Sequence, residues 1–272
     1  MHSPLDPTLQ FDSIEDTIAA FSESPSSRTS HPRRRGRQIH PTTFITHTNN
    51  IHVTNKHTNA PENGEFIIVL DSQDRENEGD LIIAADSITP AQMAFLVRHT
   101  SGLICAPVTP EIATRLALPQ MVTENADPKG TAYTVSVDAA DPSITTGISA
   151  QDRALACRIL GSPTSTAADL RRPGHVIPLQ ARPGGVRERT GHTEAAVEFC
   201  RLAGKTQAGV IAELVEDGEV VPGVPEIGGN NGMMRRDGCL RFGKKWGIKV
   251  CTIEDLVEYV ERVEGAGAVN GN

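Results

Sequence analysis

The chain has 272 residues, of which 38% are apolar and 22% charged, which is enough for a large domain with a buried core and excludes a small disulfide-stapled scaffold. The longest apolar runs, 66–70 and 81–85, are too short to span a bilayer, so we expect no membrane segment. The formal net charge of -8 disfavours nonspecific binding to a nucleic-acid backbone.

Five cysteines without a close pair fit neither a zinc ribbon nor a disulfide framework, and indicate reduced thiols, most of them in the core. The first residues contain early carboxylates and no basic stretch that leads into an apolar one, which disfavours a secretory signal. The sequence therefore predicts a cytoplasmic protein.

In chain order, a first helix is expected near 13–21, where Ile14, Ile18 and Phe21 share one face. It belongs to an N-terminal segment, 1–22, that supplies the first helix of the core. Residues 23–63 are rich in Ser, Thr, Asn and His and poor in large apolar residues, which predicts a disordered insert. Residues 64–264 are predicted to form one large α/β domain and 265–272 a flexible tail.

Strands and helices alternate from residue 64 onward. The predicted strands are 65–70, 81–85, 103–108, 133–137, 176–180, 210–215 and 248–251. Helices are expected from the capping sequence at 89–92 to before Gly102, and over 149–161, 193–203 and 252–263. This alternation predicts an α/β fold with a single layered α/β/α domain and a mixed β-sheet.

The segment from Asp71 to Asp80 contains five carboxylates and one guanidinium directly after an apolar strand. Ligands bind at the carboxyl ends of strands in open α/β sheets, and carboxylates this close raise one another's pKa unless a cation compensates them. Hard oxygen ligands favour Mg²⁺ or Mn²⁺. The alternative interpretation is a solvated acidic turn.

A second cluster, 187–194, opens the predicted helix at 193. The free N–H groups of a helix start, with Arg189 and the hydroxyls of Thr190 and Thr193, can bind a phosphate, and Gly191 allows close approach of the backbone. His192 beside them is a candidate metal ligand or proton carrier, although a histidine next to a helix cap is often structural.

Two further residues, His175 and Glu213, are suggestive only together with these clusters. His175 precedes a predicted strand, where catalytic groups are often presented, although a loop histidine is usually just solvated. Glu213 lies within an apolar strand, so its carboxylate is either paired, protonated or functional, or else faces outward. Cys105 is interpreted as a packed thiol.

Five motifs occur in order, at 74–80 (DRENEGD), 145–153 (TTGISAQDR), 172–176 (RPGHV), 189–194 (RTGHTE) and 252–256 (TIEDL). Together they closely resemble the 3,4-dihydroxy-2-butanone 4-phosphate synthase family of riboflavin biosynthesis. The resemblance extends over 11–21 and 64–262, and the stretch 228–237 is similar to the fungal, monofunctional form. The family joins the first helix to the strand at 64 by a few residues, so the 23–63 insert is a departure from it.

The resemblance implies a lyase that converts D-ribulose 5-phosphate into (2S)-2-hydroxy-3-oxobutyl phosphate and formate, with Mg²⁺ or Mn²⁺ as cofactor, in a homodimer. It implies that Glu76 and His192 bind the metal and that His175 and Glu213 are essential for catalysis. The substrate-binding residues that it implies are Arg75, Asp80, Thr131, Arg189, Thr190, Gly191, His192 and Thr193.

The reaction needs a base at carbon 3 of the ketose, a cation on the enediolate oxygens and groups that deliver protons. We assign the proton transfers to Glu78, Asp80, His175 and Glu213 together, without ranking them. Two alternatives from other classes are a nucleic-acid-binding protein that uses the basic cluster 33–37, and a catalytically inactive sensor of sugar phosphates. A test of RNA binding at physiological salt addresses the first and a formate assay the second.

Overall fold

The computed structural model describes residues 8–22, 66–216 and 232–265. The predicted insert at 23–63, the basic cluster 33–37 within it and all but the first residue of the predicted tail lie outside these ranges.

A seven-stranded sheet forms the centre of the fold, in the order β4-β5-β3-β6-β2-β1-β7. The strands are β1 (Ile67–Leu70), β2 (Gly79–Ala84), β3 (Cys105–Val108), β4 (Val137–Ala139), β5 (Leu170–Gln180), β6 (Gly209–Glu213) and β7 (Lys249–Thr252). The pairs β1–β7 and β3–β5 are parallel and the other neighbours are antiparallel. The prediction of a mixed sheet is therefore confirmed.

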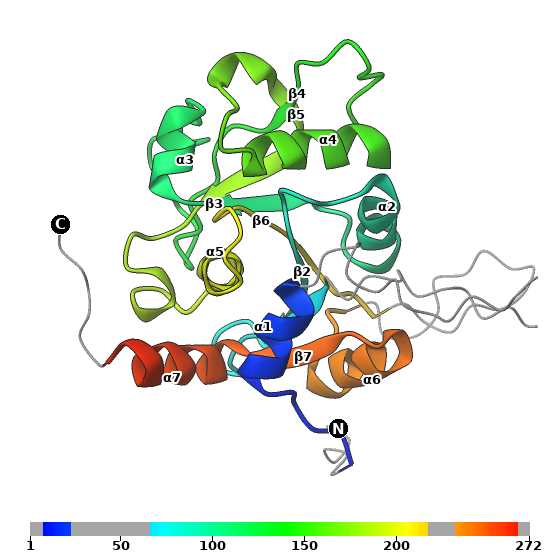
Figure 1. Cartoon of the computed structure of the whole chain (residues 1–272), viewed down its shortest axis with the longest axis vertical. Helices are drawn as coiled ribbons and strands as arrows, with labels where there is room; N and C mark the ends of the chain where they lie inside the picture. The colour runs from blue at the N-terminus through cyan, green and yellow to red at the C-terminus, as the bar shows by residue number, and fades with distance from the viewer. Residues whose placement is uncertain (1–7, 23–65, 217–231, 266–272) are drawn as a thin grey trace, which may run out of the picture.

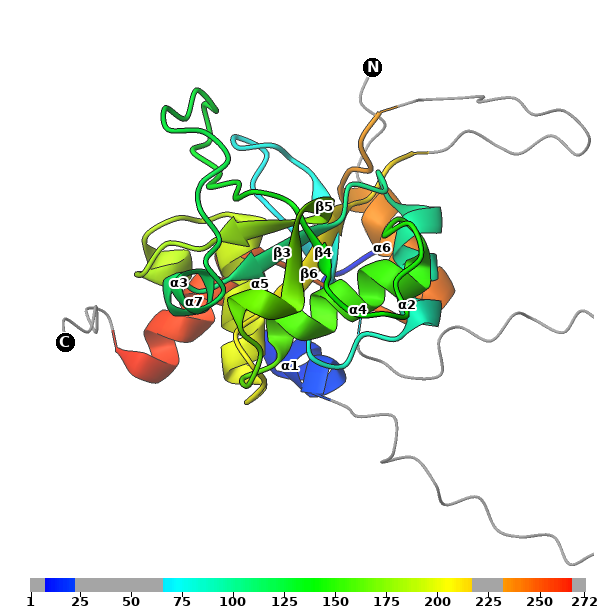
Figure 2. The same ribbon diagram turned by 90° about the horizontal axis from the view of Figure 1, so that it is seen from above.

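Helices cover both faces of this sheet (Figures 1 and 2). They are α1 (Ile14–Ser22), α2 (Pro90–His99), α3 (Pro110–Arg115), α4 (Ala150–Gly161), α5 (His192–Leu202), α6 (Arg236–Trp246) and α7 (Ile253–Glu264). One hydrophobic cluster joins the sheet to α2, α3, α4 and α6, and the other joins it to α1, α5 and α7. The domain thus has the predicted α/β/α layers.

Side chains of β1 point alternately to the two faces of the sheet, so this one strand packs against both helix layers. Ile67 and Val69 belong to the cluster with α1, α5 and α7, whereas Ile68 and Leu70 belong to the cluster on the opposite face. All four side chains are buried, and burying each one contributes about 1.5–3 kcal/mol relative to exposure. The strand that precedes the acidic residues is therefore held rigidly from two sides.

Most element boundaries lie close to the predicted ones, and the capping box of α2 forms as expected, with the Thr89 side chain accepting from the N–H of Gln92. Two strand predictions were wrong: β5 begins at Leu170 instead of 176, so His175 lies within the strand, and β4 covers Val137–Ala139 instead of 133–137. The sequence did not predict α3 and α6.

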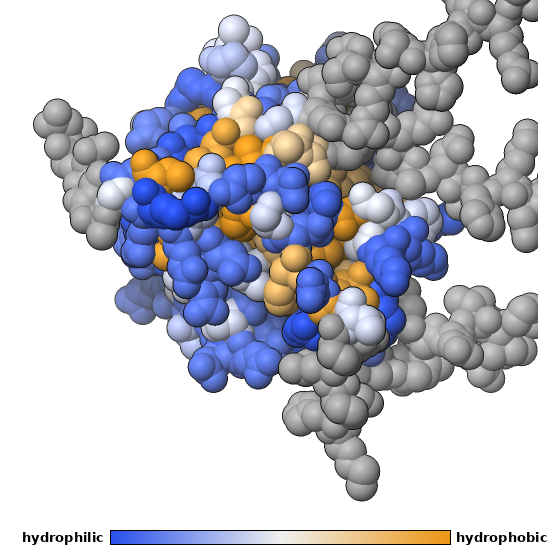
Figure 3. All heavy atoms as spheres, turned by 60° about the horizontal axis from the view of Figure 1, so that its bottom comes forward, coloured by the Kyte–Doolittle hydropathy of each residue, from blue (hydrophilic) through white to orange (hydrophobic). Residues whose placement is uncertain are grey.

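Figure 3 shows the face over α1, α6 and α7, which is mostly hydrophilic with smaller apolar areas between. Within the ranges described, the helices lack the combination of length and apolar character that a membrane span requires.

Candidate active site

The loop between β1 and β2, residues 71–78 and hereafter the acidic loop, folds around the carboxylate of its first residue. Asp71 Oδ2 accepts a hydrogen bond from the backbone N–H of Glu76 at 3.0 Å, and Oδ1 accepts one from Glu78 at 2.8 Å. The same carboxylate pairs at 2.8 Å with Arg75, whose guanidinium also contacts the carboxylate of Glu76. Asp71 therefore shapes the loop, and both of its oxygens already have donors.

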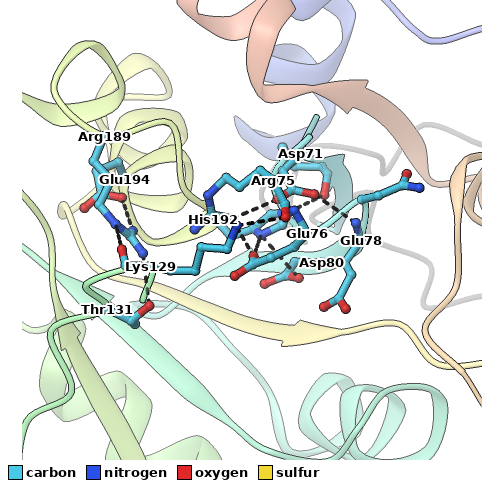
Figure 4. Close-up of polar contacts among 12 residues, drawn as sticks. Asp71, Arg75, Glu76, Glu78, Asp80, Lys129, Thr131, Arg189, His192 and Glu194 are labelled. Atoms are coloured by element: carbon cyan, nitrogen blue, oxygen red, sulfur yellow. Dashed lines mark hydrogen bonds and ion pairs between the residues drawn. The ribbon is translucent and has the colours of Figure 1, made fainter. Parts of the chain in front are cut away.

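His192, the first residue of α5, presents a nitrogen lone pair to this loop (Figure 4). Its Nε2 lies 3.1 Å from the carbonyl oxygen of Val69. A carbonyl can only accept, so Nε2 carries the hydrogen and Nδ1 is unprotonated. Burial lowers the pKa of His192 to about 4, which keeps the ring neutral at neutral pH. Nδ1 lies 4.0 Å from Oε2 of Glu76 and 3.6 Å from Oδ1 of Asp80.

Asp80 on β2 is a buried carboxylate with an unsatisfied oxygen. Its side chain is only 2% exposed, and Oδ1 has no hydrogen-bond partner among the described residues. Burial raises the pKa of Asp80 well above its usual range, and the nearby charges of Glu213, Glu76 and Glu78 raise it further. A carboxylate in such a place needs a proton or a cation.

The arrangement fits a divalent cation. Ligand atoms of Asp71, Glu76 and His192 all lie within 4.8 Å of one another, and Asp80 is next to them. Donors occupy both oxygens of Asp71 but only Oε2 of Glu76, so Glu76 and His192 are the pair better able to hold the ion. Carboxylate oxygens with one imidazole nitrogen suit Mg²⁺ or Mn²⁺ better than thiolate-binding ions. The predicted ligand pair is thus brought together from positions 116 residues apart in the chain (192 minus 76).

Two further predicted residues lie beside this pair. Glu213, the last residue of β6, is opposite Asp80 in the β2–β6 pairing. Its Oε2 accepts a hydrogen bond of 2.7 Å from the hydroxyl of Ser101, a residue that the sequence did not single out. Burial and the neighbouring charge of Glu76 raise the pKa of Glu78. Both carboxylates therefore lie beside the cluster, Glu213 through its pairing with Asp80 and Glu78 through its charge interaction with Glu76.

Arg189 is paired within the protein. Its Nη1 lies 2.6 Å from Oε2 of Glu194, whose side chain is 1% exposed, and its Nη2 donates to the hydroxyl of Thr131 at 3.0 Å. A Cβ at Gly191 would collide with the guanidinium, so glycine at this position allows Arg189 to reach Glu194. The positive charge of Arg189 is therefore already matched by a carboxylate, which the sequence did not predict.

The predicted phosphate-binding region lies at the start of α5. Gly191 is its N-cap, and the first turn of a helix has N–H groups without partners inside the helix. The hydroxyl of Thr193 is on this turn and the exposed Thr190 precedes it. These groups, with Thr131 beside Arg189, form the predicted phosphate-binding region, which borders the His192 cluster (Figure 4).

His175 is predicted to be catalytic but lies elsewhere on the sheet. Its Nδ1 is 2.9 Å from Oδ2 of Asp138 on β4, and its backbone N–H donates to Oδ1 at 2.9 Å, so Asp138 fixes the orientation of the ring. His175 is on β5, which β3 and β6 separate from β2. At about 4.8 Å per strand, this places it roughly 14 Å from the position of Asp80. One protomer does not bring His175 to the metal pair.

Sequence reasoning missed several polar residues that hold the site together. Ser101 holds Glu213, and Asp138 holds His175 across 37 residues of sequence. Asp138 directly follows the alternating run that predicts a strand, but nothing in that pattern indicates its partner. All five cysteines are free and buried, as predicted, including Cys105 in β3.

Comparison with known proteins agrees with these observations. A family model described as 3,4-dihydroxy-2-butanone 4-phosphate synthase matches residues 55–259. The protein of that name from Pyricularia oryzae is 62% identical over 213 residues, which cover 78% of this chain and 91% of the relative. Its counterpart from Candida albicans is 51% identical over 203 residues, covering 75% and 94%.

A similar structure has also been solved. It is a crystal structure of a 3,4-dihydroxy-2-butanone 4-phosphate synthase in complex with two magnesium ions, and it matches with a TM-score of 0.76 and 53% sequence identity. The match covers 94% of this chain and 99% of the other. The fold is therefore shared over essentially the whole of that relative.

Proposed function

The chain belongs to the 3,4-dihydroxy-2-butanone 4-phosphate synthase family. We therefore propose that it is the lyase of riboflavin biosynthesis that converts D-ribulose 5-phosphate into (2S)-2-hydroxy-3-oxobutyl phosphate and formate. The observation that carries this proposal is the convergence of Glu76, Asp80 and the unprotonated Nδ1 of His192 at one point. A magnesium-bound relative of the same fold supports Mg²⁺, with Mn²⁺ as the alternative.

Glu76 and His192 would hold the cation. When bound there, a divalent ion supplies positive charge that polarises the oxygens of a ketose and stabilises an enediolate. The start of α5, with Thr190, Thr193 and Thr131, would bind the phosphate and fix the register of the sugar, because these groups border the His192 cluster.

The surroundings of the carboxylates suggest how they divide the proton transfers. Ser101 donates to one oxygen of Glu213, which leaves Oε1 able to accept a proton from the substrate. In the metal-free protein, burial and neighbouring carboxylates raise the pKa values of Glu78 and Asp80, whereas a bound cation would favour their ionised forms. We propose Glu213 as a base, with Glu78 and Asp80 sharing the remaining proton transfers.

We further propose that the enzyme is a homodimer. His175 lies two strands away from Glu213 in the same protomer, and exposed apolar side chains flank it. Leu103 (46% exposed) begins the segment next to β5, and Ile148 (51% exposed) follows Gly147, which packs against the His175 ring. In a dimer, a second copy of the chain would cover these side chains. The metal-binding residues of that second copy would then lie next to His175 of the first.

The direct test is to incubate the purified protein with ribulose 5-phosphate and to measure formate, with and without a chelator. The proposal predicts formate release that the chelator abolishes and that added Mg²⁺ restores. Binding of the sugar phosphate without formate in the presence of Mg²⁺ would instead identify a sensor. The five free thiols support the cytoplasm as its compartment, which fractionation of cells would test.

A mixing experiment tests the dimer. His175→Ala and His192→Ala variants are each expected to be inactive. If His175 acts on the partner's metal pair, a refolded mixture regains about a quarter of wild-type activity, because half of the dimers are mixed and each has one complete site. A mixture that stays inactive, or a protein that is monomeric by light scattering, contradicts the proposal.

A further inference from the structure

Two cations from distant parts of the chain hold the carbonyl groups of the acidic loop. The Lys129 ammonium donates to the carbonyl oxygen of Arg75 at 2.8 Å. The Arg235 guanidinium donates to the carbonyl oxygen of Glu76 at 2.6 Å and also to that of Asn77. Three consecutive carbonyl groups around the proposed ligand Glu76 are thus bound from outside the loop.

The N–H groups of the same loop are bound from inside. The Asp71 carboxylate accepts two of them, and the Ser72 carbonyl accepts two more, from Arg75 and Asn77. Asn77 has a φ of 54°, in the left-handed region that a residue with a side chain rarely adopts. The backbone on either side of Glu76 is therefore fixed through both its donors and its acceptors, which leaves it little freedom to rotate.

Each cation also connects the loop to another part of the site. The backbone carbonyl of Lys129 accepts a hydrogen bond of 3.2 Å from Nε of Arg189, in the phosphate-binding region. In Figure 4 the Lys129 side chain extends from the Arg189 and Thr131 pair toward the acidic loop. Arg235 directly precedes α6 and follows the bridge between Val215 and Met233, which continues from the end of β6.

From this geometry we propose that Lys129 and Arg235 are positioning residues that clamp the acidic loop in its metal-binding shape before a cation arrives. The inference rests on the proposed function in one respect, the assignment of Glu76 and His192 as metal ligands. A metal loop that is ordered in advance binds its ion without first losing conformational freedom, so the clamp strengthens metal binding.

Charge repulsion alone predicts the opposite effect on metal affinity. A lysine or arginine close to a metal site repels the incoming cation, and removing it should tighten binding if charge alone matters. The clamp predicts that removing either side chain weakens binding although the site becomes more negative. The direction of the change therefore distinguishes a positioning role from a nearby charge.

The test uses Lys129→Met and Arg235→Met in the full chain, with Arg241→Met as the matched control. Arg241 is an exposed cation on α6, six residues or about 9 Å along the helix axis from Arg235. Binding of Mn²⁺ alone is followed by electron paramagnetic resonance of the free ion. We expect the Kd for Mn²⁺ to rise by about tenfold in each clamp variant, and to stay the same or fall in Arg241→Met. Lys129→Arg, which keeps a donor, should restore most of the affinity.

Hydrogen exchange of the metal-free protein gives an independent readout. Amide groups of residues 71–78 should exchange several-fold faster in Lys129→Met and Arg235→Met than in the wild type, while β1 and α5 keep their protection. Unchanged loop protection, or a Kd for Mn²⁺ that is unchanged or lower in both variants, overturns the proposal. Should the wild-type protein fail to bind Mn²⁺, the metal assignment fails, and the exchange result alone decides whether the clamp exists.

Discussion

Replacement of Asp80 by asparagine should stabilise the metal-free protein, by an amount that grows with pH. The Asp80 carboxylate is buried, its Oδ1 has no partner among the described residues, and its pKa is raised well above the usual range by burial and by the surrounding carboxylates. A raised pKa means that the folded state holds a proton that the unfolded chain has already lost. The associated stability is complete below the usual pKa of an aspartate, near 3.8, and is lost as pH rises toward the raised value.

The magnitude follows from this proton linkage. Between the usual and the raised pKa, stability decreases by about 1.4 kcal/mol for each pH unit. An amide does not ionise, so Asp80→Asn removes this dependence, and its N–H groups would face acceptors such as Nδ1 of His192. For a domain of this size, 1 kcal/mol corresponds to about 2–4 °C in Tm. The variant should therefore gain about 3–6 °C over the wild type per pH unit, until pH passes the raised pKa and the difference levels off.

The assay is thermal unfolding, followed by circular dichroism at pH 4 to 8 in the presence of a chelator. The control is Asp74→Asn, which removes a carboxylate from an exposed position of the same loop and should show no gain that grows with pH. A Tm difference for Asp80→Asn that is constant across this pH range, or that is negative throughout, would refute the assignment of Asp80 as a strained buried acid.

Four other substitutions probe the site. Glu76→Ala and His192→Ala should each abolish formate release and Mn²⁺ binding while the circular dichroism spectrum and the cooperative unfolding transition are retained; wild-type turnover in either removes the metal-site assignment. Asp138→Asn should lower kcat by about 100-fold with little change in KM, because it releases the ring of His175, and steady-state kinetics will show whether the loss falls on kcat. Gly147→Ala should lower the free energy of unfolding by about 1–3 kcal/mol in denaturant titrations and also reduce kcat, since a Cβ at this positive-φ position collides with Asp138 and His175.

The layered fold could be predicted because local and global signals agree along most of the chain. The two helices that were missed show where that agreement fails. In α6, Gly238 and Gly243 lower helix propensity, yet a Cβ at Gly243 would collide with Val250 of β7, so close packing requires the glycine. Helix α3 has only six residues and too little periodicity to be recognised, although Thr109 caps it and Pro110 starts it.

The sequence predicted which residues form the site, but not which of their charges are already paired with other side chains. The motifs placed Glu76 with His192, and the structure brings these side chains within 4.0 Å. The sequence also presented Arg189 as a cation available to a phosphate, whereas the structure pairs it with the buried Glu194. Whether a charge is available depends on partners that tertiary structure supplies, and no spacing in the sequence records them.

The pairing of the neighbouring arginines makes the charge of Lys129 important in this site. With Arg75 paired to Asp71 and Glu76, and Arg189 paired to Glu194, both arginines that the resemblance assigns to substrate binding have carboxylate partners. Lys129 instead contacts an uncharged carbonyl, so its positive charge is not matched by that contact. A dianionic sugar phosphate that enters between the acidic loop and the start of α5 would meet this ammonium at the border of the two regions. Loss of Lys129 should then weaken substrate binding as well as metal binding, and the effect on substrate should diminish at high salt, unlike the effect on loop exchange.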